Sequence, residues 1–401
     1  MIATNCVKNT ALYPTYQTER FVSEETYTSW FRAHPEPGDL IFVTKGSPGQ
    51  VCLAPDPVDF CIAQDMVALR ANKQLVYPPF LFALLRSSEI QDKIANMHVG
   101  TLIPHFKKGD FDKLSLNIPE EPEQLFIGDF YLRISERIDG LSKTNDLLES
   151  MARGIFKSWF VDFDPVRAKA EGREPEGIDA DTAANFPSEF QQSELGEIPF
   201  GWTVNAIADV AKSNRNTIGK GYAQGEIEYV DISSVEPGRI ANSTKFSLSE
   251  APSRARRLVS DGDTIWSCVR PNRRSYALIL GPSDNLVVST GFVTLTPTKI
   301  PFSLLYFTVT TSHFVDYLTS RADGAAYPAV RPEVFDGAKV IVPSAAVADK
   351  FHELTKPMLR AIEASQRQAK TLAQLRDNLL PRLISGRMRV SEAEKLVEAV
   401  L

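Results

Sequence analysis

The sequence is poor in the residues that build metal sites and disulfide frameworks. Its 401 residues include four cysteines and five histidines. The cysteines (Cys6, Cys52, Cys61 and Cys268) show no Cys-x-x-Cys pairing, and the histidines form no cluster with the spacing of metal ligands. The sequence therefore predicts neither a zinc site nor a disulfide-stabilised fold. A reducing compartment, the cytoplasm, fits this use of cysteine.

Long hydrophobic runs are also missing. The longest ones, such as residues 80–85, are far shorter than the roughly 20 apolar residues of a membrane-spanning helix. The N-terminus has no basic segment followed by an apolar run, so no secretory signal is expected. The composition is that of a globular protein, and the length suits two to three domains. The net charge of −6 argues weakly against nucleic acid as a partner, but binding depends on where the basic groups lie.

Sequence signatures of catalysis are absent. We find no GxxxxGK[ST] phosphate loop, no GxGxxG after a predicted strand, no HExxH and no GxSxG. The Asn/Asp-Pro-Pro-aromatic motif of adenine methyltransferases is missing as well. Asp162 and Asp164 have no third acidic residue nearby, so helix termination and partner docking explain them better than a metal ion. The sequence predicts no catalytic residue and no metal site.

An internal repeat is what the sequence does contain. Landmarks recur 224 positions apart: Gly100 and Gly324, Pro104 and Pro328, Phe111 and Phe335, and Pro119 and Pro343. Gly38-Asp39 recurs at this offset as Gly262-Asp263, each pair preceding a strand-like run. We infer two diverged copies of one unit of about 220 residues. Residues 196–224 have no counterpart in the first copy, which is therefore expected to lack an opening strand.

Each copy is predicted to end in a long amphipathic helix. Apolar residues recur at alternating spacings of four and three, the pattern of helices that pair in a coiled coil. Helices of roughly 30 to 40 residues are about 45 to 60 Å long, and the apolar stripe on each needs a partner. The residues predicted to pack the helix pair are Ile134, Ile138, Leu141, Leu148, Ile155, Trp159, Met358, Ile362, Leu372, Leu379 and Leu383. Asn145 and Ser365 are polar positions in the stripe that are either tolerated or fix its register.

These patterns divide the chain into six segments. They are a first, mostly β domain at 1–119, a long helix at 120–164, an extended linker at 165–200, a second β-rich domain at 201–343, a second long helix at 344–389 and an amphipathic tail at 390–401. In the first domain we expect strands at 40–44, 60–63 and 66–70 and a helix at 77–96. The first long helix is expected to stop at Asp164-Pro165, and the second to be interrupted near Pro357.

Basic residues are concentrated in one stretch of the second domain. Arg254, Arg256 and Arg257 fit a solvated face as well as a binding surface. The loop at 270–274 favours binding, because arginine suits guanine edges and phosphates and asparagine suits adenine.

The corresponding loop of the first copy, at 44–50, is less basic, but its glycines let the backbone approach a phosphate closely. A second matched pair of loops lies at 105–108 and 327–331. Different loops on a repeated frame suit two different DNA half-sites. The predicted DNA-binding residues are Lys45, Ser47, Gln50, His105, Lys107, Lys108, Arg254, Arg270, Asn272, Arg273, Arg274, Tyr327 and Arg331.

Two long motifs resemble the specificity (S) subunit of type I restriction–modification systems. The run LLESMARGIFKSWFVDFDPVRAKAEGREPEGIDADTAANFP, followed by SELGEIPFGW, is similar to the central conserved region of that family. The run LAQLRDNLLPRLISGRMRV is similar to its C-terminal conserved region. With the tandem repeat, the resemblance covers almost the whole chain.

The resemblance implies an α+β fold with an internal pseudo-two-fold repeat. Two tandem target-recognition domains, mostly β with short helices, would be joined by two long helices that form an antiparallel coiled coil. Each domain would read one half of a bipartite, asymmetric site in double-stranded DNA, and the helices would set the spacing. The short first domain departs from the family pattern, which puts the usual reading of its half-site in question.

The resemblance also implies partners and the cofactors they bind. The subunit itself would be non-catalytic and bind no cofactor. Two modification subunits would methylate adenine with S-adenosylmethionine, and two restriction subunits would translocate and cut DNA with ATP and Mg²⁺. The exposed flanks of the helices at 134–159 and 358–383 would dock the modification subunits.

Two alternatives remain at this point. One is an orphan or decoy scaffold that keeps the fold without productive DNA recognition. The other is a self-contained nuclease or methyltransferase, which the missing motifs disfavour.

Overall fold

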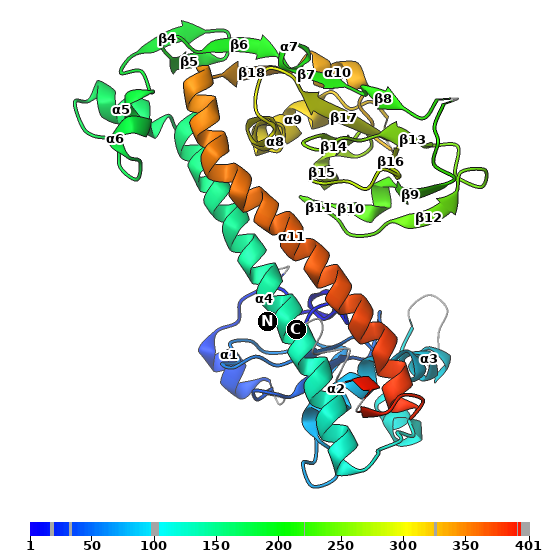
Figure 1. Ribbon diagram of the computed structural model, residues 1–401. Helices are drawn as coiled ribbons and strands as arrows, with labels where there is room; N and C mark the ends of the chain where they lie inside the picture. Colours follow the sequence, from blue (N-terminus) through cyan, green and yellow to red (C-terminus); the bar gives the residue numbers. More distant parts are fainter. Residues whose placement is uncertain are drawn as a thin grey trace. The chain divides into compact units, whose positions relative to one another are not determined.

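Two compact units make up the chain in the computed structural model. Unit 1 consists of Met1–Thr144 and Ala364–Leu401, and unit 2 of Asn145–Glu363. The structure describes residues 1–16, 20–31, 34–97, 104–219, 221–324, 327–390 and 392–393. The two longest helices, α4 (Glu121–Phe160) and α11 (Ala345–Ile384), each contribute one part to each unit (Figure 1). None of the helices in the described ranges is long and apolar enough to cross a membrane.

Unit 1 is built around a small antiparallel sheet. Its central strand β1 (Leu40–Val43) pairs with β2 (Val51–Leu53) on one side and with β3 (Met66–Leu69) on the other. All four β1 residues are buried, because Leu40 and Phe42 pack into one apolar cluster and Ile41 and Val43 into another. The other elements of the unit are η1 (Thr4–Cys6), α1 (Glu24–Ser29), α2 (Pro78–Arg86), α3 (Ser88–Met97) and η2 (Lys108–Lys113).

Unit 2 contains a five-stranded sheet, a four-stranded sheet and three two-stranded ones. The sheet orders are β12-β9-β16-β13-β8, β15-β14-β17-β7, β10-β11, β18-β6 and β4-β5. The strands are β4 (Phe190–Ser193), β5 (Gly196–Pro199), β6 (Thr203–Ala206), β7 (Ala211–Ser213), β8 (Asn216–Thr217), β9 (Glu226–Val230), β10 (Val235–Glu236), β11 (Arg239–Ile240), β12 (Thr244–Ser247), β13 (Ala255–Leu258), β14 (Thr264–Ser267), β15 (Tyr276–Leu278), β16 (Leu286–Ser289), β17 (Phe292–Pro297) and β18 (Lys339–Val342). The helices are α5 (Asp164–Ala170), α6 (Ala180–Ala184), α7 (Ile207–Val210), η3 (Ile232–Ser234), η4 (Pro271–Arg273), α8 (Phe302–Val309), α9 (Ser312–Ser320) and α10 (Pro332–Asp336).

The repeat is visible element by element. α4 and α11 begin 224 residues apart and also end 224 residues apart. The starts of α2 and α8, of α3 and α9, and of β1 and β14 show the same offset. Phe42 of β1 and Trp266 of β14 occupy equivalent places, each in the apolar cluster that takes in residues of the long helices. The predicted fold class and its internal repeat are confirmed.

The repeated Gly-Asp pair forms the same turn in both units. Gly38 and Gly262 have φ of +86° and +87°, a left-handed conformation in which a side chain would be strained. The side chains of Asp39 and Asp263 each accept a hydrogen bond at 2.8 Å, from the backbone N–H of Glu36 and Ser260 respectively. Each turn therefore fixes the start of the central strand that follows it.

The two long helices pack against each other in unit 1. Ile134 and Leu141 of α4 share one buried cluster with Leu372, Leu379 and Leu383 of α11. Arg376 donates a hydrogen bond from Nη1 to Ser135 Oγ (3.2 Å), and its guanidinium lies 5.1 Å from the Tyr131 ring centre. Ile127 lies two turns before Ser135 on α4, and Leu383 lies two turns after Arg376 on α11. Ile127 and Leu383 line one hollow of the structure, so the two helices run antiparallel.

Aromatic side chains make the corresponding contact in unit 2. The ring of Phe351 on α11 lies 5.9 Å from Phe156, 6.1 Å from Trp159 and 5.0 Å from Phe160 on α4. Trp159 also packs on Phe186, which follows α6. Among the other predicted packing residues, Ile155 and Met358 are half-buried against this core, and Ile138 is half-buried against that of unit 1. Leu148 and Ile362 are half-buried.

The first long helix ends before the predicted proline. α4 stops at Phe160, and Asp164-Pro165 begins the new helix α5, which follows Phe163 in the left-handed conformation (φ of +57°). The prediction of a stop at Asp164-Pro165 was wrong, because proline is also well accommodated in the first turn of a helix.

The segment at 165–200 is folded rather than extended, which corrects the linker prediction. It contains α5, α6 and the hairpin of β4 and β5. Val166, Phe186 and Ile198 are buried in the core of unit 2. Its low apolar content was misleading, because a few well-placed apolar residues anchor it.

Other boundaries differ from the predictions as well. Residues 60–63 form only an isolated bridge between Ile62 and Ile2, and the helix expected at 77–96 is two helices that break at Ser87. α11 runs through Pro357 without interruption. Most of the predicted tail at 390–401 and the landmark Gly100 lie outside the described residues.

Candidate functional site

The acidic residues at the end of α4 have structural roles. The carboxylate of Asp162 forms an ion pair with Lys157. Asp164 is the first residue of α5, where a negative charge stabilises the positive end of the helix dipole. No group of three or more His, Cys, Asp or Glu side chains suited to a metal ion occurs in the described parts of the chain.

Two predicted DNA-binding loops of unit 2 lie side by side. Val269 and Ala329 form an isolated antiparallel bridge between them. The backbone N–H of Arg270 donates to the carbonyl of Pro328 (2.7 Å). The Arg270 guanidinium stacks 4.6 Å from the ring centre of Tyr327, whose side chain is 70% exposed. The structure thus joins a cation and an aromatic ring from loops about sixty residues apart in the sequence.

The loop at 270–274 has an unusual backbone. Arg270 and Arg274, which flank η4, have φ of +50° and +57°, a conformation uncommon for residues other than glycine. Pro271 is buried beneath the turn, whereas Asn272 and Arg273 are exposed. Arg274 donates a hydrogen bond to Ser312 Oγ (3.0 Å) at the start of α9. The turn therefore presents Asn272 and Arg273 to solvent while its ends are held.

Unit 1 repeats this arrangement with different side chains. Lys45 and His105 form the equivalent bridge, and the backbone N–H of Gly46 donates to the Pro104 carbonyl (3.0 Å). Each of these residues lies 224 positions before its counterpart in unit 2. Ser47, Lys107 and Lys108 are exposed, and Lys45 and His105 are half-buried.

Contacts within unit 1 hold these two loops in place. The backbone N–H of Lys107 donates to Asp110 Oδ2 (2.8 Å), and Lys113 pairs with Oδ1 of the same carboxylate (2.9 Å). The hydrogen bond from Lys113, and after it the one from the Lys107 N–H, lowers the pKa of Asp110. The side-chain oxygen of Gln50 accepts from the backbone N–H of Asn9 (2.7 Å), so Gln50 supports the loop. The sequence pattern does not predict this contact.

The remaining predicted residues differ in their placement. Arg331 is exposed and directly precedes α10, close in sequence to Tyr327. Arg254 is exposed at the start of β13, in the five-stranded sheet, whereas the loop at 270–274 follows β14 of the four-stranded sheet. The neighbouring Arg257 is half-buried, and burial lowers its pKa. Ser312, which anchors Arg274, was missed, although Thr311-Ser312 before an apolar run is a helix-start signal.

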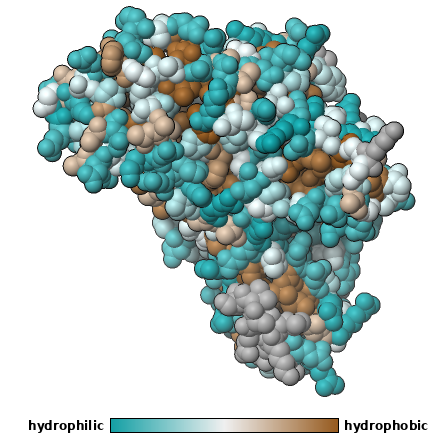
Figure 2. Space-filling view, turned by 45° about the horizontal axis from the view of Figure 1, so that its top comes forward, coloured by the Kyte–Doolittle hydropathy of each residue, from teal (hydrophilic) through white to brown (hydrophobic). Residues whose placement is uncertain are grey.

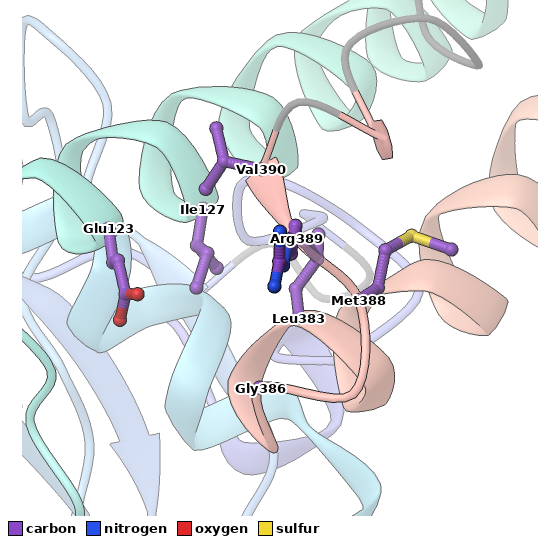
Figure 3. A pocket seen from close by; sticks show the side chains of 7 residues that line it. All are labelled: Glu123, Ile127, Leu383, Gly386, Met388, Arg389 and Val390. Atoms are coloured by element: carbon purple, nitrogen blue, oxygen red, sulfur yellow. The ribbon is translucent and has the colours of Figure 1, made fainter.

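A hollow of about 400 Å³ lies in unit 1, where the chain turns back after α11 (Figure 3). Ile127 of α4 and Leu383 of α11 both line it, and Glu123 and Arg389 are the charged residues at its wall. Gly386, with φ of +68°, makes the turn that follows the helix. These residues form neither a nucleophile–base pair nor a metal-ligand set, so the hollow offers no catalytic arrangement.

The face of the molecule shown in Figure 2 is mostly polar. Figure 2 shows mostly hydrophilic residues on the face turned to the viewer, with separate hydrophobic patches between them. Some exposed apolar side chains belong to the long helices, including Leu147 (62% exposed) and Met151 (48% exposed) of α4. They lie four residues apart, and therefore on one face of the helix.

Comparison with known proteins gives concordant matches. Residues 1–150 match the Methylase_S family, described as the type I restriction modification DNA specificity domain. The HindI specificity subunit of Haemophilus influenzae is 24% identical over 405 residues, with 87% of this chain and 86% of that protein covered. The MjaIX specificity subunit of Methanocaldococcus jannaschii is 22% identical over 366 residues, with 88% and 78% covered.

The fold has a counterpart among solved structures. The S subunit of a type I restriction–modification system from M. genitalium superposes with a TM-score of 0.54 at 15% identity, with 96% of this chain and 91% of that chain covered. The repeat, the two long helices, the domain match and the relatives agree. Residues 1–150 thus match the type I restriction modification DNA specificity domain, and the chain is similar over most of its length to type I restriction enzyme specificity subunits.

Proposed function

We propose that this chain is a non-catalytic subunit that recognises a bipartite, asymmetric sequence in double-stranded DNA, with one unit for each half-site. The observation that carries the proposal is the repeated pair of adjoining loops. Both pairs have the same backbone bridge and hydrogen bonds at an offset of 224 residues. Their exposed side chains differ, as two different half-sites require.

The chemistry of the unit 2 loops supports this proposal. Arg273 and Asn272 are exposed on a constrained turn, and these side chain types make bidentate contacts with guanine and adenine. Tyr327 and Arg270 offer a stacked aromatic–cation pair at the same place. Each bidentate base contact is worth about 1–3 kcal/mol of discrimination against a wrong base.

The unit 1 loops offer positive charge and backbone donors. Lys107 and Lys108 are exposed on one loop, and Gly46 and Ser47 on the other. Lysine ammonium groups and closely approaching backbone amides are typical phosphate contacts. In this proposal unit 1 contacts its half-site with more phosphate contacts and fewer arginine–base contacts than unit 2.

The long helices are proposed to set the distance between half-sites and to dock two modification subunits. Their 40-residue length corresponds to about 60 Å, more than one DNA turn of about 34 Å. The exposed apolar Leu147 and Met151 give α4 a surface suited to a protein partner. Two restriction subunits would complete the complex. S-adenosylmethionine, ATP and Mg²⁺ would bind to the partner subunits, and this chain would bind no cofactor.

Selection from a random duplex library tests the proposal. The chain is assembled with its modification subunits and incubated with the library, and the bound duplexes are sequenced. Enrichment of two short conserved elements separated by a fixed non-conserved spacer is expected. A bound pool with no sequence preference would refute DNA recognition and favour the decoy scaffold.

A further inference from the structure

Arg257 of β13 is a half-buried cation that has no counter-ion in the described part of unit 2. Its Nε is enclosed and has no hydrogen-bond partner there, and the guanidinium forms no ion pair with a described carboxylate. Burial lowers its pKa, and the group that acts against burial is the thiol of Cys268. Enclosing a positive charge without an anion costs free energy. The arrangement therefore indicates that an anionic ligand completes it.

Two other half-buried arginines of unit 2 show the contrast. Arg153 pairs with Glu149 at 2.7 Å, and Arg360 donates from Nη1 to Asp261 Oδ1 at 2.9 Å. The charge of each of these arginines is thus balanced within the unit. Arg257 differs from them in having no such carboxylate, so its partner has to come from outside the described residues.

The strand that carries Arg257 is linked to the end of β14, although β13 and β14 belong to different sheets. The backbone N–H of Thr290 donates to the Arg254 carbonyl (2.8 Å). The next residue, Gly291, accepts a hydrogen bond from the backbone N–H of Cys268 (2.8 Å). The turn between β16 and β17 therefore joins the start of β13 to the residue that follows β14.

Cys268 in turn connects Arg257 with the two candidate DNA-binding loops of unit 2. It lies directly before the loop at 270–274, and its carbonyl accepts from the backbone N–H of Val330 in the loop at 327–331 (2.8 Å). Burial raises the pKa of its thiol to about 11, and the charge of Arg257 opposes this rise. The Arg257 guanidinium is thus close enough to act on the residue at the base of both loops.

A β-bulge gives β13 its unusual arrangement of basic side chains. The pairing of β13 with β16 shifts between Ala255 and Arg257, so that Arg256 is an extra residue. Since successive side chains of a strand point to opposite faces, an extra residue changes where the following ones point, and such bulges are common beside functional sites. Arg254 and Arg256 are exposed on either side of the buried Ala255. Three arginines within four residues therefore lie beside the loops.

We propose that Arg257 binds a phosphate of the DNA backbone next to the unit 2 half-site, with Arg254 and Arg256 beside it. The inference rests on the proposed function and assigns a phosphate seat to the same surface. The planar guanidinium suits phosphate oxygens, and phosphate contacts fix the position of a protein on DNA whereas base contacts specify the sequence. Arg257 is anchored in a sheet, so it positions the duplex against the side chains that read bases.

The salt dependence of DNA binding tests the inference. The chain is assembled with its modification subunits, and the affinity for the selected duplex is measured over a range of salt concentrations. Arg257→Gln is expected to weaken binding about tenfold, because a hydrogen-bonded charge contact is lost. The slope of log K against log salt is expected to become shallower by about one. The selected motif should stay unchanged, and Arg257→Lys should keep most of the slope.

Two controls separate a phosphate contact from a role in folding. Arg239→Gln removes an exposed arginine of unit 2 that pairs with Glu236, and it should leave the salt slope unchanged. Urea unfolding of the free chain is the second control. Arg257→Gln is expected not to lower the midpoint, because the charge that it removes has no counter-ion in the described fold. A lowered midpoint would show that Arg257 acts within the fold and would overturn the inference.

The remaining outcomes identify other anions. A retained motif with an unchanged salt slope for Arg257→Gln would overturn the inference alone. If inorganic phosphate stabilised the chain but not this variant, and the slope were unchanged, the site would belong to a free anion. Impaired assembly with the modification subunits at an unchanged slope would assign it to a carboxylate of the partner. A library selection without sequence preference would refute the proposed function, and this inference with it.

Discussion

Asp39 and Asp263 occupy one position of the repeat but meet different neighbours. Arg70 donates to Asp39 from Nε to Oδ1 and from Nη2 to Oδ2, both at 2.8 Å. In unit 2 the residue at the position of Arg70 is Thr296. Burial by itself acts to raise the pKa of both carboxyl groups. For Asp39 the hydrogen bonds from Arg70 and from the Glu36 N–H outweigh burial and lower its pKa, whereas the pKa of Asp263 stays raised.

These opposite shifts predict opposite pH dependences. The ordinary pKa of an aspartate in an unfolded chain is about 3.9. The stabilisation from Asp39 is complete above that value and is lost as the pH falls through its lower folded-state pKa. The contribution of Asp263 has the reverse sign, since it is most favourable at low pH and is lost as the pH rises through its raised pKa.

The substitutions Asp39→Asn and Asp263→Asn form a matched test. At pH 7, Asp39→Asn is expected to lower the free energy of local opening around β1, because the charged pair with Arg70 is lost. Asp263→Asn is expected to leave β14 unchanged or to stabilise it. The Asp39→Asn effect shrinks below about pH 4. Hydrogen exchange of the two strands measures both, and equal destabilisation at pH 7 would contradict this account.

Arg273 carries the sharpest expectation for DNA binding. It is exposed on the constrained turn of unit 2. Arg273→Ala is expected to weaken specific binding by the assembled complex by about 1–3 kcal/mol and to relax one base position. Arg173→Ala, at an exposed arginine beyond α5 that pairs with Glu171, is the control and should change little. Titration of labelled duplexes at fixed salt measures both. If Arg273→Ala changes neither the DNA affinity nor the base preference, Arg273 does not contact the DNA.

At the scale of elements, Phe351 joins α11 to α4 in unit 2. It is 0% exposed and contacts three aromatic residues of α4. Phe351→Ala is expected to destabilise unit 2 by about 3–5 kcal/mol, because it leaves a cavity among these rings. Leu354→Ala, on the same helix but 43% exposed, should cost much less. Urea unfolding followed by tryptophan fluorescence distinguishes them, and similar midpoints would show that the aromatic contact is unimportant.

The sequence predicted the elements that follow from periodicity and repetition. The two long helices came from their apolar spacing, and the equivalence of the loops came from the common offset. Prolines were harder to interpret, since Pro165 begins a helix and Pro357 lies inside one. Tertiary packing decides whether a proline begins a helix, lies inside one or ends one, and this packing cannot be inferred from a single sequence.

The sequence indicated which loops form the candidate site, but it did not indicate which residues contact each other there. The matched landmarks Pro104 and Pro328 indicated which loops correspond, and both carbonyls accept the same backbone hydrogen bond. The contacts of Gln50 with Asn9 and of Arg274 with Ser312 could not be predicted, because they join residues about 40 positions apart; the helix-start signal at Thr311-Ser312 does not say which side chain meets it. The folded segment at 165–200 was missed for a related reason, since Val166, Phe186 and Ile198, which join it to the core, lie far apart in the sequence.

At the scale of the whole molecule, both long helices pass from one unit to the other. Insertion of seven residues after Thr144 in α4 and after Glu363 in α11 preserves the apolar stripe and lengthens each helix by about 10.5 Å. The spacer of the recognised sequence is then expected to grow by about three base pairs, with both half-sites unchanged. Library selection with the lengthened chain measures this. An unchanged spacer would show that the helices do not set the spacing.

The map of methylated adenines tests the central claim most directly. DNA is modified by the complex of this chain with its modification subunits, and every methylated adenine is sequenced with its flanks. The account predicts a bipartite motif in which Arg273→Ala relaxes one half alone and Lys107→Ala affects the other half alone. A contiguous motif, or relaxation of the same half by both substitutions, would contradict recognition by two separate units.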